Sequence, residues 1–429
     1  MNPLVLLMGS FFALILLKVP IVFVFIISST LTILSLRMPL LSVLNHVYSS
    51  IDSFTLLAVP FFLLLGQLMN HGGITERLVR LSNALIGHIR GGLGHVNVLV
   101  SMLFAGLSGS SVADTAGVGA MLIPAMAKLK FPVAFSAAVT ACSSTLGGII
   151  PPSIIMVVYA SLARLSVGAM FLAGVVPGVL IGLSQMAYTY YMAVRHDFPA
   201  NQRASVKEIG VSFVSAFPAL LLPLIVLGGV TFGIFTATES AAIAVVYGIF
   251  LLLFVYRSTS FRAIPGVLSR ALIGYSLPLM AVASAGIMGW LIAYLDAPAM
   301  ILNFLFSITE SELGIALLLV AFLLVLGTFL SPIISVVVFL PILQAMGTAA
   351  GMEPLHLGII VVLTLSLGRV TPPYGICMLV AAQIAEIPSH RVFIASIPMI
   401  VLTLLIIVTG ILVPDLFLFL PRTLMGAFL

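Results

Sequence analysis

Long apolar runs separated by short polar segments follow one another along almost the entire chain. A run of about 20 apolar residues has the length that an α-helix needs to cross the hydrocarbon core of a bilayer. The pattern therefore predicts a series of helices, which we place at residues 3–17, 19–36, 51–70, 92–107, 112–128, 131–162, 168–194, 211–230, 234–256, 271–293, 313–330, 333–347, 355–386 and 391–413.

Two further segments have the pattern of amphipathic helices. In residues 74–90, apolar side chains from Ile74 to Ile89 recur on one face, opposite Arg77 and Arg80. Residues 297–310 are shorter and moderately apolar, and acidic residues follow them. We expect both segments to lie along the membrane interface.

The composition excludes a soluble globular protein. Of the 429 residues, 62% are hydrophobic and 7% are charged, whereas a soluble domain has about 25% charged residues. The apolar residues suffice for on the order of a dozen crossings. The net charge of +5 comes from Lys and Arg scattered between apolar runs, without the basic stripe that binds nucleic acid. Cys142 and Cys377 lie inside apolar segments, which favours packing over a disulfide or a metal site.

The few charges predict the topology, because basic loops stay on the cytoplasmic side. By this rule, residues 91–130 begin and end inside and turn at a Gly/Ser-rich tip, 106–111 (GLSGSS). Residues 312–353 begin and end outside and turn at 327–332 (GTFLSP). Each arm has about 16 residues, which is short for a full crossing. We therefore predict two re-entrant helical hairpins that enter from opposite faces.

A repeat follows each hairpin. Residues 145–153 (TLGGIIPPS) align with 366–374 (SLGRVTPPY), and 372 minus 151 gives an offset of 221, about half the chain. Each Pro-Pro pair removes two backbone donors and breaks its helix. Inverted copies of a broken helix beside a hairpin indicate a secondary transporter with its site at mid-membrane. The predicted fold is thus an all-α polytopic membrane protein, an inverted-repeat transporter with two re-entrant hairpins and two broken helices.

This organisation predicts five parts of the chain. Scaffold helices and an interfacial arm alternate with two transport halves, each made of one hairpin and one broken helix. The predicted parts are an N-terminal scaffold with the first arm at 1–90, the first transport half at 91–165, scaffold helices with the second arm at 166–310, the second transport half at 311–388 and a C-terminal scaffold helix at 389–429.

The groups exposed at the two breaks are suited to binding a cation and an anion. Freed backbone carbonyls at each break and hydroxyls at each hairpin tip form an oxygen cage suited to a hard cation such as Na⁺. Half-helix N-termini at the same place present N–H groups and a positive dipole end to an anion. A merely structural kink at each Pro-Pro pair is the alternative.

The chain resembles the large membrane subunit (M, or DctM-like) of the tripartite ATP-independent periplasmic (TRAP) transporters, over essentially its whole length. The motifs that carry the resemblance are 53–62 (SFTLLAVPFF), 68–74 (LMNHGGI), 91–93 (GGL), 104–114 (FAGLSGSSVAD), 123–126 (IPAM), 149–153 (IIPPS) and 171–178 (FLAGVVPG).

The resemblance implies a sodium-coupled, elevator-type importer of small organic anions, usually carboxylates, in the lipid of the bacterial inner membrane. It implies two partners, a small membrane subunit (Q, DctQ-like) and a periplasmic substrate-binding protein (P). It also implies two Na⁺ sites at the junctions of hairpin tips and broken helices, which map onto Ser108, Ser110, Gly147 and Ile150, and onto Gly327, Thr328, Gly368 and Thr371.

The second half departs from the family pattern. Ser331 stands where an acidic residue commonly precedes the tip proline, Arg369 replaces an apolar residue, and Tyr374 replaces a small one. An arginine at mid-membrane indicates a functional site, and its guanidinium can hold a carboxylate through two hydrogen bonds. We predict a substrate site formed by Arg369, Ser111, Pro152, Ser153, Ser331 and Tyr374.

Structural roles remain open for the charged residues. Arg369 could instead pair with Asp114 or Glu239, or extend to water. For Asp114 we expect support of the first hairpin tip through backbone N–H groups, with neutralisation of a cation as the alternative. Glu239 follows Thr236 in the pattern of a helix cap with an acid in the first turn.

Two other functions compete with this hypothesis. The sequence 106–109 (GLSG) also matches the short signature of intramembrane serine proteases, but no histidine is predicted at mid-depth in a later helix to act as base. A stand-alone sodium/dicarboxylate symporter of similar architecture would need neither partner. We predict a transporter rather than an enzyme.

Overall fold

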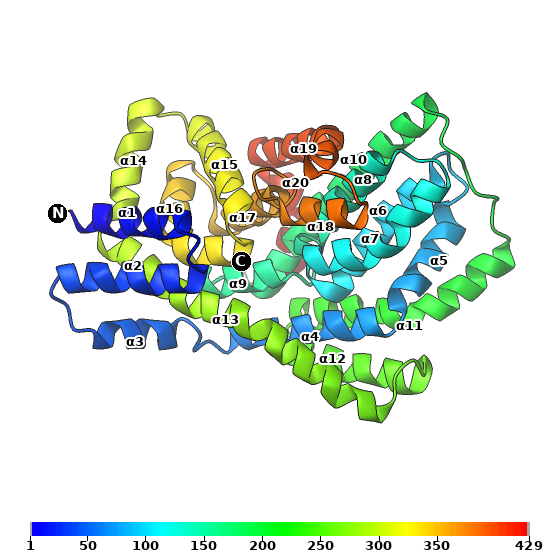
Figure 1. Cartoon of the computed structure of the whole chain (residues 1–429), viewed down its shortest axis with the longest axis horizontal. Coiled ribbons are helices and arrows are strands. Elements are labelled where there is room, and N and C mark those ends of the chain that lie inside the picture. Colours follow the sequence, from blue (N-terminus) through cyan, green and yellow to red (C-terminus); the bar gives the residue numbers. More distant parts are fainter. Residues whose placement is uncertain (1, 427–429) are drawn as a thin grey trace.

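The structure is a computed structural model that describes residues 2–426, the side chain of His71 apart, and it is helical throughout this range (Figure 1). The first half contains α1 (Pro3–Leu16), α2 (Ile21–Ser35), α3 (Leu41–Ser49), α4 (Ala58–His71), α5 (Ile74–Ile86), α6 (Gly92–Ser108), α7 (Ser111–Lys128), α8 (Val133–Ser144), α9 (Ile154–Ala163) and α10 (Val167–Arg195). The second half contains α11 (Val206–Thr231), α12 (Ala237–Phe250), α13 (Ile264–Tyr294), α14 (Ala297–Ile308), α15 (Glu312–Phe329), α16 (Pro332–Ala349), α17 (Pro354–Gly368), α18 (Ile376–Ile384), α19 (Ser389–Leu412) and α20 (Pro414–Met425).

The predicted all-α fold is confirmed, and each predicted apolar run is helical. The runs 131–162 and 355–386 are divided by the Pro-Pro pairs into α8 and α9 and into α17 and α18. Seven helices among residues 2–426 are long and apolar enough to cross a membrane, fewer than a dozen, because several apolar runs form short helices of 10–17 residues. Sequence patterns missed α3, which has nine residues, and α20, which contains Pro421.

Both hairpins close on themselves and approach the middle of the molecule from opposite sides (Figure 1). The two ends of the first hairpin, α6–α7, meet the same end of α10. A β-carbon at Gly91 would lie 2.6 Å from that of Ala193, and the Phe131 ring lies 4.6 Å from the ring of Phe198. In the second hairpin, α15–α16, a β-carbon at Gly351 would lie 3.0 Å from Oε2 of Glu312. Each chain segment thus returns to the side from which it started.

The two broken helices form the core between the hairpins. Every residue from Phe135 to Ser144 in α8 is buried, as is every residue from Leu355 to Gly368 in α17. The two repeats contact each other directly, because a β-carbon at Gly358 in α17 would lie 2.6 Å from the Tyr159 ring in α9. Burial on all sides is what an interrupted helix needs, since its unpaired backbone groups cannot face lipid.

Helices α4 and α13 run past this core. A β-carbon at Gly66 in α4 would lie 3.2 Å from the backbone of Ser108, so α4 crosses the tip of the first hairpin. Helix α13 packs against α4, α16 and α2. The arm helix α5 buries its apolar side, and its Arg77 guanidinium lies 4.1 Å from the centre of the Tyr256 ring. These contacts fix the outer helices relative to the hairpins.

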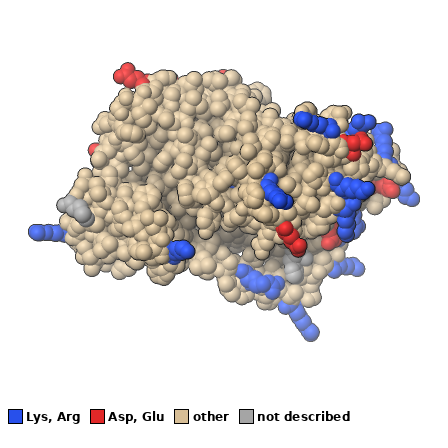
Figure 2. Space-filling model, turned by 45° about the horizontal axis from the view of Figure 1, so that its top comes forward, with Lys and Arg blue, Asp and Glu red and all other residues tan. Residues whose placement is uncertain are grey.

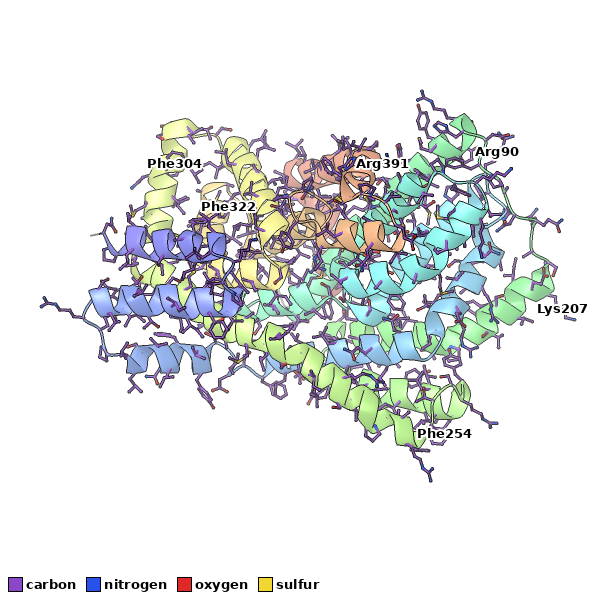
Figure 3. All side chains as sticks on the ribbon, in the orientation of Figure 1. Arg90, Lys207, Phe254, Phe304, Phe322 and Arg391 are labelled. Carbon is purple, nitrogen blue, oxygen red and sulfur yellow. The ribbon has the colours of Figure 1, made fainter. Side chains whose placement is uncertain are left out.

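The charges support the orientation predicted from the loops. Most Lys and Arg side chains on the face in Figure 2 gather at one end, and Figure 3 labels Arg90 and Lys207 at this end. The predicted cap at the start of α12 is confirmed, since Thr236 Oγ1 accepts from the Glu239 N–H at 3.2 Å and the Glu239 carboxylate accepts from the Thr236 N–H at 2.8 Å. Glu239 therefore has a structural partner and lies outside the core.

Single cysteines can test the two hairpins. Introduced at Arg90 and at Lys130, which flank the first hairpin, both should react with a membrane-impermeant maleimide only from the cytoplasmic side. Introduced at Glu310 and at Glu353, both should react only from the opposite side. All four positions are exposed, whereas the native Cys142 and Cys377 are buried and supply the background control. Labelling of Arg90 and Lys130 from different sides would show that α6–α7 crosses the membrane.

Candidate functional site

At the first junction, the tip of α6–α7 packs directly on the break after α8. A β-carbon at Gly147 would lie 2.9 Å from the backbone nitrogen of Ser111, so only glycine permits this approach. Ser110 caps α7, its hydroxyl accepting from the Ala113 N–H at 3.5 Å, and the Ser108 hydroxyl accepts from the Ser110 N–H at 3.3 Å. Among the described residues, no hydrogen bond reaches the carbonyl oxygens of Gly147 and Ile150. Two hydroxyls and two free carbonyls thus come from adjacent segments.

The second junction repeats the close approach of a hairpin tip to a break, but its Gly368 carbonyl accepts hydrogen bonds from the Thr371 N–H at 3.3 Å and from the Thr371 hydroxyl. A β-carbon at Gly368 would lie 2.6 Å from the α-carbon of Gly327, so the tip of α15–α16 touches the end of α17. The Thr371 hydroxyl donates to the Gly368 carbonyl at 3.0 Å, and the Thr328 hydroxyl donates to the Val325 carbonyl at 2.8 Å. Ser331 caps α16 just as Ser110 caps α7, and the two caps differ by the same offset of 221. Both Pro-Pro bonds are cis.

A buried polar cluster lies between the two breaks. A β-carbon at Gly148 would lie 2.7 Å from the Ser366 hydroxyl and 3.6 Å from the Ser111 hydroxyl. Neither hydroxyl has a hydrogen-bond partner within the described chain, and the same holds for both carboxylate oxygens of Asp114. The hydroxyls of Ser101 and Ser144 lie near this carboxylate but bond to Ser143 and to the Thr140 carbonyl. Unpaired buried oxygens of this kind are costly unless a cation or water binds them.

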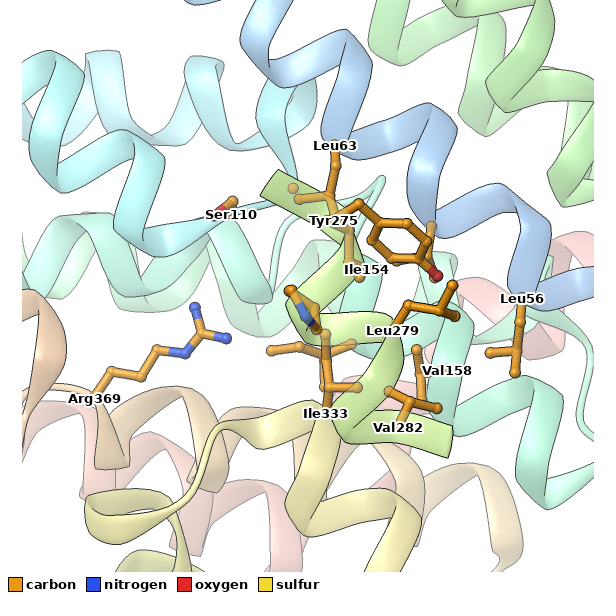
Figure 4. Close-up of a pocket in the computed structure, with 14 residues that line it drawn as sticks. Leu56, Leu63, Ser110, Ile154, Val158, Tyr275, Leu279, Val282, Ile333 and Arg369 are labelled. Atoms are coloured by element: carbon orange, nitrogen blue, oxygen red, sulfur yellow. The ribbon is translucent and has the colours of Figure 1, made fainter. Parts of the chain in front are cut away.

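A cavity of about 110 Å³ opens beside the breaks (Figure 4). The tip of the first hairpin, α9, α16, α4 and α13 all contribute to its wall. Arg369, just after α17, points its guanidinium into the cavity (Figure 4). Arg369 forms no ion pair with Asp114 or Glu239 in this structure, and its Nε has no hydrogen-bond partner. The guanidinium is thus an unpaired cation at the edge of an apolar space.

A wider cleft of about 300 Å³ lies farther along the same pair of helices. Gln67 and Asn70 of α4 and Val267 and Arg270 of α13 line it. Because α4 and α13 also border the cavity at Arg369, both spaces lie along one interface.

The structure divides the predicted site residues among different surroundings. Arg369 and Ser110 line the cavity. Ser111, Pro152 and Ser153 are buried in the packed break, where the Ser153 hydroxyl donates to the Gly148 carbonyl at 2.7 Å. Ser331 and Tyr374 are exposed outside the cavity, and Tyr374 retains 63% of its accessible surface. Asp114 lies in the first turn of α7, but the residue that caps this tip is Ser110.

Several residues of the site escaped the sequence analysis. Leu56 and Leu63, near and on α4, and Tyr275 and Leu279 on α13 line the cavity, although they lie far from both repeats in the sequence. In the sequence, Ser366 is distinguished only by its place at the start of the second repeat. No local pattern distinguishes these residues from other apolar or helical positions, because the packing of the helices alone brings them to the cavity.

Two buried histidines, His95 and His356, lie away from Ser108 and do not supply it with the base that a serine protease requires. His95 lies at the other end of α6, where its Nε2 is 3.1 Å from the Arg90 carbonyl, and His356 Nε2 is 2.9 Å from the Gly410 carbonyl. Neither ring faces the hairpin tip.

The family model described as "Tripartite ATP-independent periplasmic transporter, DctM component" matches residues 8–416. The chain belongs to this family. It is 35% identical over 382 residues to the sialic acid TRAP transporter large permease protein SiaM of Vibrio cholerae, covering 89% of this chain and 90% of the relative. It is 40% identical over 364 residues to the C4-dicarboxylate TRAP transporter large permease protein DctM of Pseudomonas aeruginosa, covering 84% and 85%.

Solved transporter structures share the fold. The Alcanivorax borkumensis YdaH transporter superposes with a TM-score of 0.62 at 13% identity, covering 86% of each chain. The Neisseria gonorrhoeae MtrF efflux pump superposes with a TM-score of 0.60 at 15% identity, covering 88% of this chain and 84% of that one. The TRAP permease subunit is therefore an inner-membrane transport protein and not an enzyme.

The glycine contact at the second junction makes a stability prediction. Gly368→Ala places a methyl group against the backbone of Gly327, and overpacking of this kind costs about 1–3 kcal/mol. Gly228→Ala is the matched control, since a β-carbon at Gly228 in α11 would have no neighbour within 4 Å. We expect the Tm of the purified Gly368→Ala protein to fall and that of Gly228→Ala to stay level or rise. Equal Tm values for the two variants would contradict the close packing.

Proposed function

We propose that this TRAP permease subunit imports a small organic anion across the inner membrane, driven by sodium and by an elevator motion. The observation that carries the proposal is the unpaired Arg369 guanidinium in a cavity between a broken helix and the facing hairpin tip. The named substrates of the relatives, sialic acid and C4-dicarboxylate among them, are acids, which agrees with a cationic group in the site.

The proposed role of Arg369 is to hold the carboxylate of the substrate. A guanidinium offers two parallel N–H donors that match the two oxygens of a carboxylate. A partly buried arginine without an acidic partner is unfavourable in an apolar environment, and a bound anion reduces that penalty. The substrate and the arginine thus neutralise each other in the membrane.

The proposed sodium sites are the two junctions. Sodium would bind at Ser108, Ser110, Gly147 and Ile150 in the first and at Gly327, Thr328, Gly368 and Thr371 in the second. Hard cations prefer hydroxyl and carbonyl oxygens of this type. The free carbonyls of Gly147 and Ile150 support the first site, and the clustered Thr371 hydroxyl and Gly368 carbonyl support the second.

Coupling follows from the shared backbone. The tip residue Ser110 belongs to the first sodium site and also lines the cavity, and Arg369 directly follows the sodium-site residue Gly368. A sodium ion that orders these segments raises the affinity for the anion, and the anion raises the affinity for sodium by the same factor.

In the proposed motion, residues 91–165 and 311–388 move together against a scaffold of the remaining helices. The cavity wall supports this division, since it includes Arg369, Ser110 and α9 from the moving part and α4 and α13 from the scaffold. The cleft at Gln67 and Arg270 extends along the same interface and is the proposed path of release to the cytoplasm.

The proposed transporter includes two partners. TRAP large permeases work with a small membrane subunit and a periplasmic binding protein. The isethionate TRAP transporter permease protein DctMQ of Oleidesulfovibrio alaskensis is 33% identical to this chain over 415 residues. Its name combines those of the large (M) and small (Q) membrane components.

Substitution of Arg369 tests the substrate site. We expect Arg369→Gln to abolish concentrative uptake of the substrate, because the carboxylate then loses its counter-charge. Arg369→Lys should retain partial uptake with an apparent affinity at least about tenfold weaker, since a charged hydrogen bond is worth about 1.5–3 kcal/mol and an ammonium cannot match the paired geometry. Arg164→Gln, at a helix end away from the cavity, is the matched control. Unchanged uptake and affinity in both Arg369 variants would refute the proposed role.

Reconstitution tests the coupling ion and the partners together. In proteoliposomes containing both membrane subunits and supplied with the binding protein, uptake should stop when choline replaces sodium at constant membrane potential. Concentrative uptake that persists in choline would exclude sodium coupling. Uptake by this chain without either partner would instead favour the stand-alone symporter.

A further inference from the structure

We propose that the anion carried by this subunit has one acidic group and a short, unhydroxylated apolar body. This inference rests on the proposed function and narrows its substrate class. It follows from the walls of the cavity at Arg369, which provide one cation and very few other polar groups.

The charge in the cavity matches one acidic group. Arg369 is the one charged side chain among the residues that line the described cavity. A second carboxylate on the substrate would lie against aliphatic side chains, where an ion without a partner is strongly disfavoured. Asp114 does not line the cavity, and its negative charge would add repulsion rather than binding. The site therefore favours a monoanion over a dicarboxylate.

The rest of the wall is apolar. Besides Arg369, the polar side chains that line the cavity are those of Ser110 and Tyr275, and the Ser110 hydroxyl already caps α7. The apolar lining residues are Leu56, Val59, Leu63, Ile154, Ile155, Val158, Pro278, Leu279, Val282 and Ile333. The hydroxyls of Ser110 and Tyr275 replace only part of the hydrogen bonds to water that the four hydroxyls of a five-carbon sugar acid give up here, whereas an aliphatic body gains from the transfer.

The charged group and the apolar wall lie at different ends of the cavity. In Figure 4, Arg369 reaches the cavity from one side, and Tyr275, Leu279 and Leu56 lie on the other. A ligand with its carboxylate at Arg369 thus directs its body between α13 and α4. A cavity of about 150 Å³ lined by apolar side chains accommodates benzene, so the 110 Å³ here suits a body of a few carbon atoms.

Direct ligand binding tests this inference without the selectivity of the binding protein. The purified full-length chain with its small subunit, in lipid nanodiscs with sodium, is heated with one of three probes. The probes are 3-methyl-2-oxobutanoate, with a branched apolar body, arabinonate, with the same number of carbons but four hydroxyls, and succinate, with two carboxylates. A ligand that binds the folded state stabilises it by RT ln(1 + [L]/Kd), so at equal concentration the ligand with the lower Kd raises the Tm more. We expect a clear rise with 3-methyl-2-oxobutanoate and a rise at least about fivefold smaller with the other two.

A pair of leucines on α13 supplies the matched variants. Leu279 lines the cavity, whereas Leu277 is 74% exposed on the outer surface of the same helix. We expect Leu279→Ala to weaken binding of 3-methyl-2-oxobutanoate by about fivefold or more, because apolar contact with the ligand is lost. Leu277→Ala should change this affinity by less than about twofold.

The outcomes separate the two proposals. Equal or stronger binding of arabinonate or succinate overturns the apolar monoanion and leaves organic-anion import intact. Equal effects of Leu279→Ala and Leu277→Ala overturn the placement of the substrate body between α4 and α13. Absence of binding for all three acids, in sodium and at millimolar concentration, overturns the proposed anion site at Arg369 itself.

Discussion

The need to satisfy backbone polar groups in an apolar environment governs this structure. A helix interrupted by Pro-Pro leaves carbonyls without donors, and lipid offers none. Both interruptions are therefore enclosed by other helices, and α8 and α17 are buried on all sides as they approach the breaks. The hairpins are the elements that complete this enclosure. Their tips bring capped helix ends and hydroxyls to the breaks, so the requirement that protects the backbone also gathers hydroxyl and carbonyl oxygens at each junction.

Glycine allows each hairpin tip to approach its broken helix closely. At Gly147 and Gly368, the backbone of a broken helix touches the backbone of a hairpin tip, and a methyl group would fill the space between them. A side chain at either position would push the hairpin tip away from the break. The first junction carries more hydroxyls at its tip, whereas the second carries Arg369 at the position that Gly148 occupies in the first repeat. The two junctions thus share a backbone arrangement but differ in their side chains.

The positions of the few charged residues also distinguish the two junctions. A membrane protein with 7% charged residues keeps nearly all of them in loops, where water solvates them. Arg369 and Asp114 are the exceptions that lie in the core, and they do not pair with each other. The two side chains therefore lie in different surroundings. Arg369 faces the cavity, where an anion can reach it, and Asp114 faces a group of hydroxyls beside the first junction.

Most of the helices, the two breaks, the inverted repeat and the family could be predicted from the sequence, because hydrophobic periodicity, Pro-Pro pairs and charged loops are local features; α3 and α20 could not. The sequence also singled out Arg369, since an arginine inside an apolar run is conspicuous without any structure. Only the tertiary structure decided which residues share a space with it. Ser110 reaches the cavity but Tyr374, five residues from Arg369, is exposed outside it, and Leu63 and Leu279 arrive from helices more than two hundred residues apart. The physical reason is that the cavity wall is formed by helix packing, which depends on contacts between distant segments that no local pattern records.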